Sequence, residues 1–255
     1  MTAIKELYSY FDKKIPRELS CEWDNDGLMV CADGAKPAKK VLFALDVTDE
    51  TADYAISGGY DVIISHHPLI FAPLRAINTE NPVCARALRL IAAGVSVFSF
   101  HTRLDALEGG VNDILAAALG LRDTVPFGPA GEEIGRIGRL PCKMSAADFT
   151  ALVKEKISRH ITGHFTGNEI ETVAVIGGSG KDFIRAAKSC GADVILLGEA
   201  GYHAVLDAPS SGISIVEAGH YETEKGVCAF FASAFAEDFP QLKFDIYPRG
   251  NSFVH

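Results

Sequence analysis

Two kinds of side chain that bind metal ions, imidazole and carboxylate, stand directly after three apolar segments of the chain. The pairs are His66 and His67 after DVIIS (61–65), His101 and Asp105 after VSVFSF (95–100), and His220 and Glu224 after GISIVEAG (212–219). Neutral imidazole and carboxylate are the ligand types of zinc, iron and manganese sites. Two adjacent histidines alone are more often structural than functional, but three such clusters together predict a metal site.

The adjacent histidines indicate two metal ions rather than one. Neighbouring side chains in a strand point to opposite faces, and beyond the strand end the two rings still diverge. One ion would use both rings with difficulty, whereas two ions could take one ring each and share a carboxylate such as Glu224. Two-metal sites hold their ions about 3.5–4 Å apart, activate water and stabilise a developing oxyanion, which favours hydrolysis. His220 and Glu224 face the same way if a helix begins near residue 220, and that helix terminus favours an anionic substrate.

The elements that must position these residues follow an alternating pattern of strands and helices. The expected strands are 41–47, 61–65, 95–100, 172–178, 193–201, 212–220 and 242–247, and the expected helices are the segment before Pro16, 49–59, 81–94, 110–120, 145–158, 182–191 and 223–239. This alternation predicts an α/β fold with largely parallel sheets. Ligands in such folds bind beyond the carboxyl ends of the strands, where the three clusters stand.

Two segments of the chain resemble each other, which favours a fold of two related α/β lobes. Strands at 41 and 173 are each followed 20 positions later by a DV-I strand, and both histidine–carboxylate clusters at 101 and 220 follow a strand. The tract RDTVPFGPAGEEIG (122–135) interrupts the pattern with proline and glycine, so we place a boundary there. We expect a metal-binding lobe of residues 1–123 with 219–255 and a second lobe of residues 124–218. Similarity among all βαβ units is the alternative explanation of the resemblance.

Other motifs supply weaker candidates for the site. GGSGKD (177–182) fails as a P-loop because Val175 stands at the position of its first glycine and Asp182 at the position of its serine or threonine. The N–H groups of its turn, at Gly178 and Gly180, could still hold an anion, although a plain turn explains them equally well. GEAGYH (198–203) puts Glu199 and His203 at a fourth strand end, where the residues alone indicate an ordinary surface position.

Asp46 lies at the end of the expected strand 41–47 and could support a ligand from behind, whereas Asp24 and Asn25 are most simply turn residues. The remaining histidines are expected on the surface: His160, His164 and His255.

Composition narrows the class of protein. The net charge of −9 argues against nucleic acid as the main partner, because phosphate backbones require a basic surface. The sequence shows neither a signal peptide nor an apolar run long enough to cross a membrane. Six scattered cysteines without a CxxC pair indicate reduced core residues of a cytoplasmic protein.

Six motifs resemble the NIF-three-like family, also catalogued as GTP cyclohydrolase I type 2 homologues. They are WDNDGLMV (23–30), SHHPLIF (65–71), HTRLDA (101–106), GGSG (177–180), GEAGYH (198–203) and GHYETE (219–224). The resemblance implies a NIF-three-like fold of two α/β lobes and a toroidal homohexamer with metal pairs facing an inner cavity. It also implies five ligands for two divalent ions (Zn, Fe or Mn): His66, His67, Asp105, His220 and Glu224. The resemblance places GEAGYH near the cavity, which makes Glu199 and His203 candidate substrate contacts or acid–base groups. Tyr221 stands where a second histidine is common in the family, and Glu222 is an additional carboxylate.

We therefore expect a metal-dependent hydrolase that acts on a small anionic molecule such as a nucleotide or phosphoester. His101 or His203 would move the proton. A non-catalytic, regulatory metal-binding hexamer is the alternative. Five ligands shared by two ions leave open coordination positions, which favours catalysis. A ring that encircles DNA is disfavoured by the net charge of −9.

Overall fold

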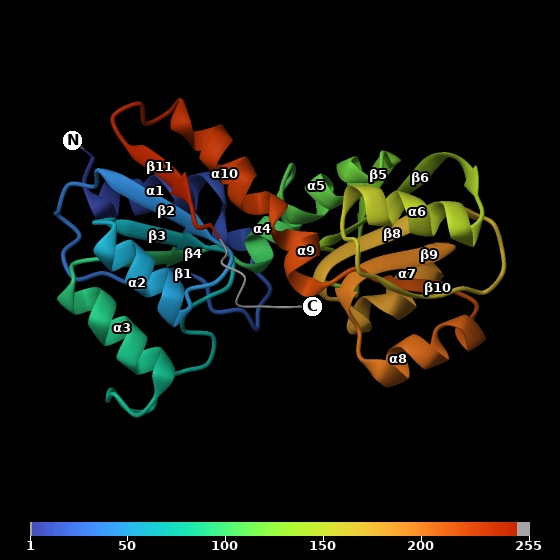
Figure 1. Cartoon of the computed structure of the whole chain (residues 1–255), viewed down its shortest axis with the longest axis horizontal. Helices are drawn as coiled ribbons and strands as arrows, with labels where there is room; N and C mark the ends of the chain where they lie inside the picture. The colour runs from blue at the N-terminus through green and yellow to red at the C-terminus, as the bar shows by residue number, and fades with distance from the viewer. Residues whose placement is uncertain (1, 249–255) are drawn as a thin grey trace. The chain divides into compact units, whose positions relative to one another are not determined.

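A computed structural model describes residues 2–248 of the chain, and the expected surface position of His255 falls outside them. The described residues form two compact units (Figure 1). Among the described residues, unit 1 contains those up to Leu104 together with 227–248, and unit 2 is Asp105–Gly226. The chain therefore enters unit 2 within helix α4 (Thr102–Ala106) and leaves it at the start of helix α10 (Gly226–Ala236). None of the helices among the described residues is long and apolar enough to cross a bilayer.

Unit 1 contains a five-stranded sheet in the order β1-β4-β3-β2-β11. The strands are β1 (Gly27–Val30), β2 (Lys40–Ala44), β3 (Val62–Ser65), β4 (Ser96–Ser99) and β11 (Lys243–Ile246). Strands β4, β3, β2 and β11 run parallel, and β1 pairs antiparallel with β4 at the edge. The predicted parallel sheet is therefore present, with one antiparallel edge strand that the sequence pattern did not show.

Helices cover both faces of this sheet. On one face, α2 (Asp49–Ser57) and α3 (Pro82–Ala92) bury small and aliphatic side chains against Leu42 and Ile63. On the other face, α1 (Ile4–Lys14) and α10 supply aromatic rings, among them Phe231, which stacks on Phe43 with ring centroids 5.3 Å apart. Strand β2 thus faces aliphatic side chains on one side and aromatic side chains on the other, as the alternation of a doubly covered strand requires.

Unit 2 contains a six-stranded mixed sheet in the order β5-β6-β8-β9-β10-β7. The strands are β5 (Arg122–Phe127), β6 (Gly135–Met144), β7 (Thr162–His164), β8 (Ile170–Ser179), β9 (Val194–Glu199) and β10 (Ser214–Glu217). Only β8, β9 and β10 run parallel. The tract at 122–135, which we interpreted as an interruption, contains strand β5 and the turn into β6.

The helices of unit 2 also lie on both faces of the sheet (Figure 1). Helices α5 (Val111–Ala118) and α6 (Ala146–Lys156) pack on the face formed by Val173, Val194 and Val216. Helices α7 (Ile184–Ser189) and α8 (Tyr202–Asp207) lie on the other face. A short helix, α9 (His220–Glu224), follows β10 directly, so the single helix predicted over 223–239 is in fact two helices.

The two units repeat one arrangement, as the sequence resemblance predicted. Three parallel strands (β2-β3-β4 and β8-β9-β10) carry an antiparallel neighbour beside the third strand, β1 or β7. In both, an aspartate before the second strand accepts two backbone N–H bonds from the start of the first. Asp61 accepts from Lys39 and Lys40, and Asp193 accepts from Glu171 and Thr172. Two related α/β lobes are therefore the fold of this chain.

Candidate metal centre

Unit 1 gathers three histidines at the carboxyl ends of two neighbouring strands. His66 and His67 follow β3, and His101 follows β4. The strands are parallel and in register, with Ser65 opposite Ser99, so their ends coincide. The ring centroids lie 4.9 to 5.7 Å apart, and one ring nitrogen from each histidine lies within 4.8 Å of the others. Three imidazoles at this spacing could hold a metal ion.

Each of the three rings is held from behind by an oxygen that accepts a hydrogen bond from Nδ1. The acceptor is Asp46 for His67 (2.7 Å), Asp24 for His101 (2.9 Å) and the Phe100 carbonyl for His66 (3.2 Å). Carboxylate and carbonyl oxygens carry no hydrogen, so Nδ1 holds the proton and the lone pair of the neutral ring is on Nε2. This is the arrangement that orients histidine ligands in metal sites. Asp46 contacts His67, as expected of a supporting residue, and its role behind a metal ligand stays a prediction.

Asp24 does more than form the turn that the sequence indicated, because it also fixes a histidine. Its carboxylate is fully buried and accepts hydrogen bonds from His101, from the Thr102 backbone N–H (3.0 Å) and from the Thr102 hydroxyl (2.6 Å). Burial alone would raise the pKa of Asp24, but the hydrogen bond and charge of His101 and the two bonds from Thr102 lower it to about 2. The carboxylate therefore stays charged and fixes the orientation of His101.

Unit 2 carries its own group of imidazole and carboxylates. His220 and Glu224 begin and end helix α9, and His220 Nε2 lies 3.3 Å from Glu224 Oε2, as the i,i+4 spacing predicted. The Nδ1 of His220 donates to Glu199 at the end of β9 (3.1 Å). Asp105 and Glu224 are both buried, and one carboxylate oxygen of each lies within 4.8 Å of the other. Two buried carboxylates this close repel each other, and a cation between them would offset that repulsion.

Glycines at the end of β8 make room for the Glu224 carboxylate. Gly178 has a φ of +65°, which disfavours other residues, and a Cβ there would overlap Glu224 Oε1 and lie 3.0 Å from His220 Nε2. A Cβ on Gly177 would lie 3.0 Å from Glu224 Cγ. This segment therefore shapes the environment of the predicted ligands rather than only forming a turn.

The N–H groups of the same segment already have partners within the protein. Gly178 donates to the Thr223 hydroxyl (3.1 Å), and Gly180 donates to the Glu199 carbonyl (2.9 Å). An anion near Gly178 and Gly180 would thus need donors other than these two backbone groups, and a substrate-binding role for them stays a prediction.

The remaining candidates lie in different surroundings. Glu199, expected among the substrate contacts, holds His220. His203 is exposed on α8, where its ring lies 5.4 Å from that of Tyr202, and its proposed acid–base role stays a prediction. His160, expected as a plain surface residue, lines a pocket of unit 2. No local pattern distinguished it from His164.

Cysteine usage partly follows expectation. Cys21, Cys84 and Cys228 are buried, whereas Cys142 and Cys190 are exposed and therefore are not core residues.

The donor sets of both units suit divalent transition metals. Imidazole nitrogens and carboxylate oxygens are ligands of zinc, iron and manganese. In unit 1 the rings are oriented by oxygen acceptors, and in unit 2 glycines leave space around a buried carboxylate. The residues present therefore fit metal ions, as the strand-end clusters predicted.

Comparison with known proteins defines the class of this α/β protein. The family model described as Duf34/NIF3 (NGG1p interacting factor 3) matches residues 2–249. A "GTP cyclohydrolase 1 type 2 homolog" of Clostridium perfringens is 33% identical over 227 residues, covering 87% of this chain and 86% of the relative. A protein of the same name from Clostridium acetobutylicum is 32% identical over 231 residues, covering 87% and 85%.

A solved structure extends the agreement to the fold. The Bacillus cereus protein related to NIF3 matches with a TM-score of 0.88 and 25% identity over 99% of both chains. The chain belongs to the Duf34/NIF3 family, and the resemblance carried by its six motifs is confirmed.

Proposed function

We propose that this protein is a metal-dependent hydrolase that binds two divalent ions per chain. The ligands would be His66, His67, Asp105, His220 and Glu224, with Glu224 shared between the ions. The observation that carries the proposal is the anchoring of every histidine in the set. An oxygen atom accepts from Nδ1 of each, which makes Nε2 the ligand nitrogen.

Hydrolysis is the chemistry that this ligand set supports best. Five ligands for two ions leave coordination positions for water and substrate, unlike the closed four-ligand shell of a structural zinc site. When bound, a pair of divalent ions lowers the pKa of water and stabilises negative charge on oxygen. His101 has a proton on Nδ1, held by Asp24, and a basic Nε2 that accepts and passes on a proton.

The substrate would be a small anionic molecule, either a nucleotide or another phosphoester. The relatives named "GTP cyclohydrolase 1 type 2 homolog" favour a nucleotide. A screen of nucleotides, cyclic amides and phosphoesters, run with manganese, iron and zinc in turn, tests this. If no substrate turns over above the metal-free background, the protein is instead a non-catalytic metal-binding assembly.

Metal analysis tests the centre independently of any substrate. Protein purified without added ions should contain close to two metal ions per chain, measured by inductively coupled plasma mass spectrometry. His67→Ala and Glu224→Ala should lower that content and abolish turnover while circular dichroism stays unchanged. A metal content near zero in a folded wild-type protein would contradict the proposal.

His101→Gln separates a ligand from a proton-transfer residue. In the proposed role, the variant keeps its metal and loses turnover by about 10²–10⁴-fold. A loss of metal would instead make His101 a third imidazole ligand, because its nitrogen lies as close to His66 and His67 as a ligand would.

We further propose a toroidal hexamer as the assembled form, which the family resemblance implies. Sedimentation equilibrium should then give six times the 27.3 kDa mass of one chain. A monomer or dimer at all concentrations tested would contradict the hexamer but leave the metal centre untouched.

A further inference from the structure

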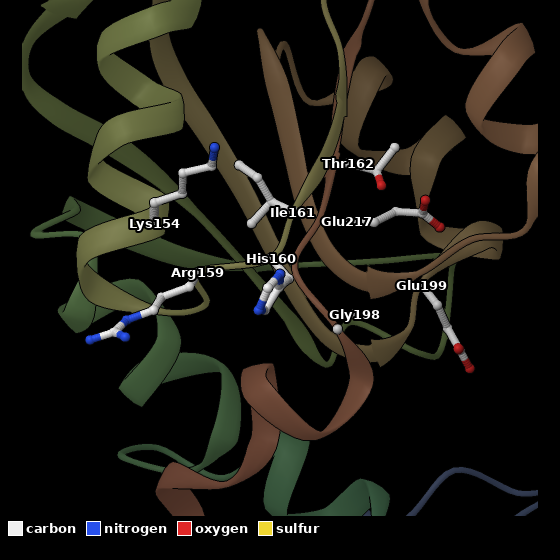
Figure 2. Close-up of a pocket in the computed structure, with 9 residues that line it drawn as sticks. Lys154, Arg159, His160, Ile161, Thr162, Gly198, Glu199 and Glu217 are labelled. Atoms are coloured by element: carbon white, nitrogen blue, oxygen red, sulfur yellow. The ribbon is translucent and has the colours of Figure 1, made fainter. Parts of the chain in front are cut away.

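A pocket of about 480 Å³ opens in unit 2 at the carboxyl ends of β9 and β10. Its lining comes from the end of α6, the segment into β7, and the two strand ends (Figure 2): Lys154, Arg159, His160, Ile161, Thr162, Gly198, Glu199, Glu217 and Gly219. Strand β7 runs antiparallel to β10, with Thr162 opposite Glu217, which brings the start of β7 to this edge. The position is the one at which α/β sheets bind ligands.

Two cations of the pocket have no partner among residues 2–248. Neither the Lys154 ammonium nor the Arg159 guanidinium takes part in a hydrogen bond or ion pair with any residue that the structure describes. A nearby lysine differs in this respect, since Lys156 pairs with Glu155 at 2.7 Å. In a chain with a net charge of −9, two unpaired cations that line one pocket indicate an anionic ligand.

The two carboxylates that line the pocket are committed to protein groups. Glu217 accepts from the Ala200 N–H (2.7 Å), and Glu199 accepts from His220 Nδ1 (3.1 Å). Figure 2 shows them across the pocket from Lys154 and Arg159, with His160 between the two sides. The pocket is thus polarised, with positive charge beside α6 and negative charge beside the ends of β9 and β10.

We propose that this pocket binds a phosphorylated small molecule, with its phosphate at Lys154 and Arg159. Arginine recognises phosphate oxygens through paired N–H groups and lysine through a point charge, and the Thr162 hydroxyl is a further donor. The volume exceeds what one phosphate fills and lies in the range of small-molecule pockets. The carboxylates repel a second anion, so the opposite end of the ligand presents hydroxyl or amino donors to Glu199 and Glu217.

This proposal deepens the proposed function and rests on it for the identity of the reacting end. Two lining residues connect the pocket to His220, a proposed metal ligand. Gly219 precedes His220 in the chain, and Glu199 accepts a hydrogen bond from its Nδ1. A phosphate bound at Lys154 and Arg159 would therefore place the other end of the molecule beside His220. The pocket selects a phosphate-bearing substrate, and the metal centre acts on a different part of it.

The test is binding of inorganic phosphate to the full chain, measured by titration calorimetry at low salt. The protein is measured as purified and again after removal of metal by a chelator. Lys154→Met with Arg159→Gln should weaken phosphate binding at least tenfold, since charged hydrogen bonds to phosphate are lost. The control pair, Lys143→Met with Arg139→Gln, removes the same charge from exposed positions of unit 2 and should change binding less than twofold.

Several outcomes would overturn the pocket. They are no phosphate binding to the wild type, equal weakening in both double variants, and binding that disappears when metal is removed. Lys154→Arg keeps the charge and should retain binding, which guards against a misfolded double variant. Phosphate binding by a wild type that contains no metal would refute the proposed hydrolase and leave the pocket. Two metal ions per chain without phosphate binding would refute the pocket and leave the proposed metal centre.

Discussion

The buried guanidinium of Arg103 allows a quantitative prediction about the support of the histidine cluster. Arg103 lies in α4, two positions after His101, and its side chain is completely buried in unit 1. It donates two bonds to Asp26, both 2.8 Å long, and one each to Asp12 (2.7 Å) and the Ile15 carbonyl (2.9 Å). These interactions outweigh the effect of burial and raise the pKa of Arg103, so it is permanently charged.

The cost of Arg103→Met follows from what each partner loses. The side chain of Asp26 is 1% exposed, so its carboxylate would stay buried without its cation, which costs about 3–5 kcal/mol. The side chain of Asp12 is 37% exposed and can be hydrated instead, so losing its ion pair costs at most about 1 kcal/mol of unfolding free energy. We expect unit 1 to lose about 4 kcal/mol of unfolding free energy. At a urea dependence of about 2 kcal/mol/M, the midpoint falls by about 2 M.

Tryptophan fluorescence measures this loss in unit 1 alone. Trp23 is the only tryptophan of the sequence and packs beside Phe71 and His101 in unit 1. Urea unfolding followed at Trp23 is therefore insensitive to how unit 2 unfolds, which matters because a chain with two units need not unfold in one step.

Two further variants decide whether the cost comes from the buried charge. The double variant Arg103→Met with Asp26→Leu removes both charges and should recover at least half of the lost stability, because an apolar pair can replace a buried ion pair. Arg103→Lys keeps the charge but not the paired geometry and should fall between wild type and Arg103→Met. A loss below about 1 kcal/mol for Arg103→Met, or no recovery in the double variant, would refute this account.

Three other predictions concern the support of the candidate centre. Asp46→Asn removes the carboxylate behind a predicted histidine ligand and should weaken metal binding about 10–100-fold in a competition with a chelator, whereas a change under twofold would contradict that role. Gly178→Ala should displace Glu224 and lower metal content. The control Gly167→Ala, also at positive φ but with open space around its Cβ, should leave metal content unchanged, and equal effects of the two variants would point to backbone strain alone. The pKa of Asp24 is about 2 when folded against 3.8 for the free group, so its stabilisation, worth about 2 kcal/mol, is complete above about pH 5 and falls as pH drops toward 2. The advantage of wild type over Asp24→Asn, measured by urea unfolding, should therefore shrink by about 1 kcal/mol between pH 6 and pH 3, and an advantage independent of pH would exclude a contribution from this charge.

Sequence patterns located the elements whose own residues determine their structure. Strands β2, β3 and β4 are short apolar runs because helices cover both of their faces. Helix α3 begins where Asn81 and Pro82 predict, with the Asn81 side chain accepting from two backbone N–H groups.

Elements that depend on a partner strand were missed. Strand β5 is largely exposed and contains Pro126, which only an edge strand tolerates, and its structure depends on pairing with β6. Strand β7 has the sequence TGH and forms only against β10. Neither segment carries apolar alternation of its own, so local patterns could not reveal them.

The candidate site shows the same division between local and distant information. The sequence predicted that His66, His67 and His101 lie close together, because each follows a strand and neighbouring parallel strands end at the same edge of a sheet. The role of Asp24 could not be predicted, because its partner His101 is 77 residues away and a hydrogen bond over that distance leaves no local pattern. The cations of the unit 2 pocket were likewise indistinguishable from other surface lysines and arginines.

The interruption of unit 1 by unit 2 imposes an order on biosynthesis. Residues 105–226 leave the ribosome as a continuous stretch and can close their own sheet at once, since domains fold as units during synthesis. The first half of unit 1 must wait until Phe231 and β11 are translated, with Phe43 and the edge of β2 uncovered meanwhile. Nascent chains stalled between these two points would therefore be the form of this protein most in need of a chaperone.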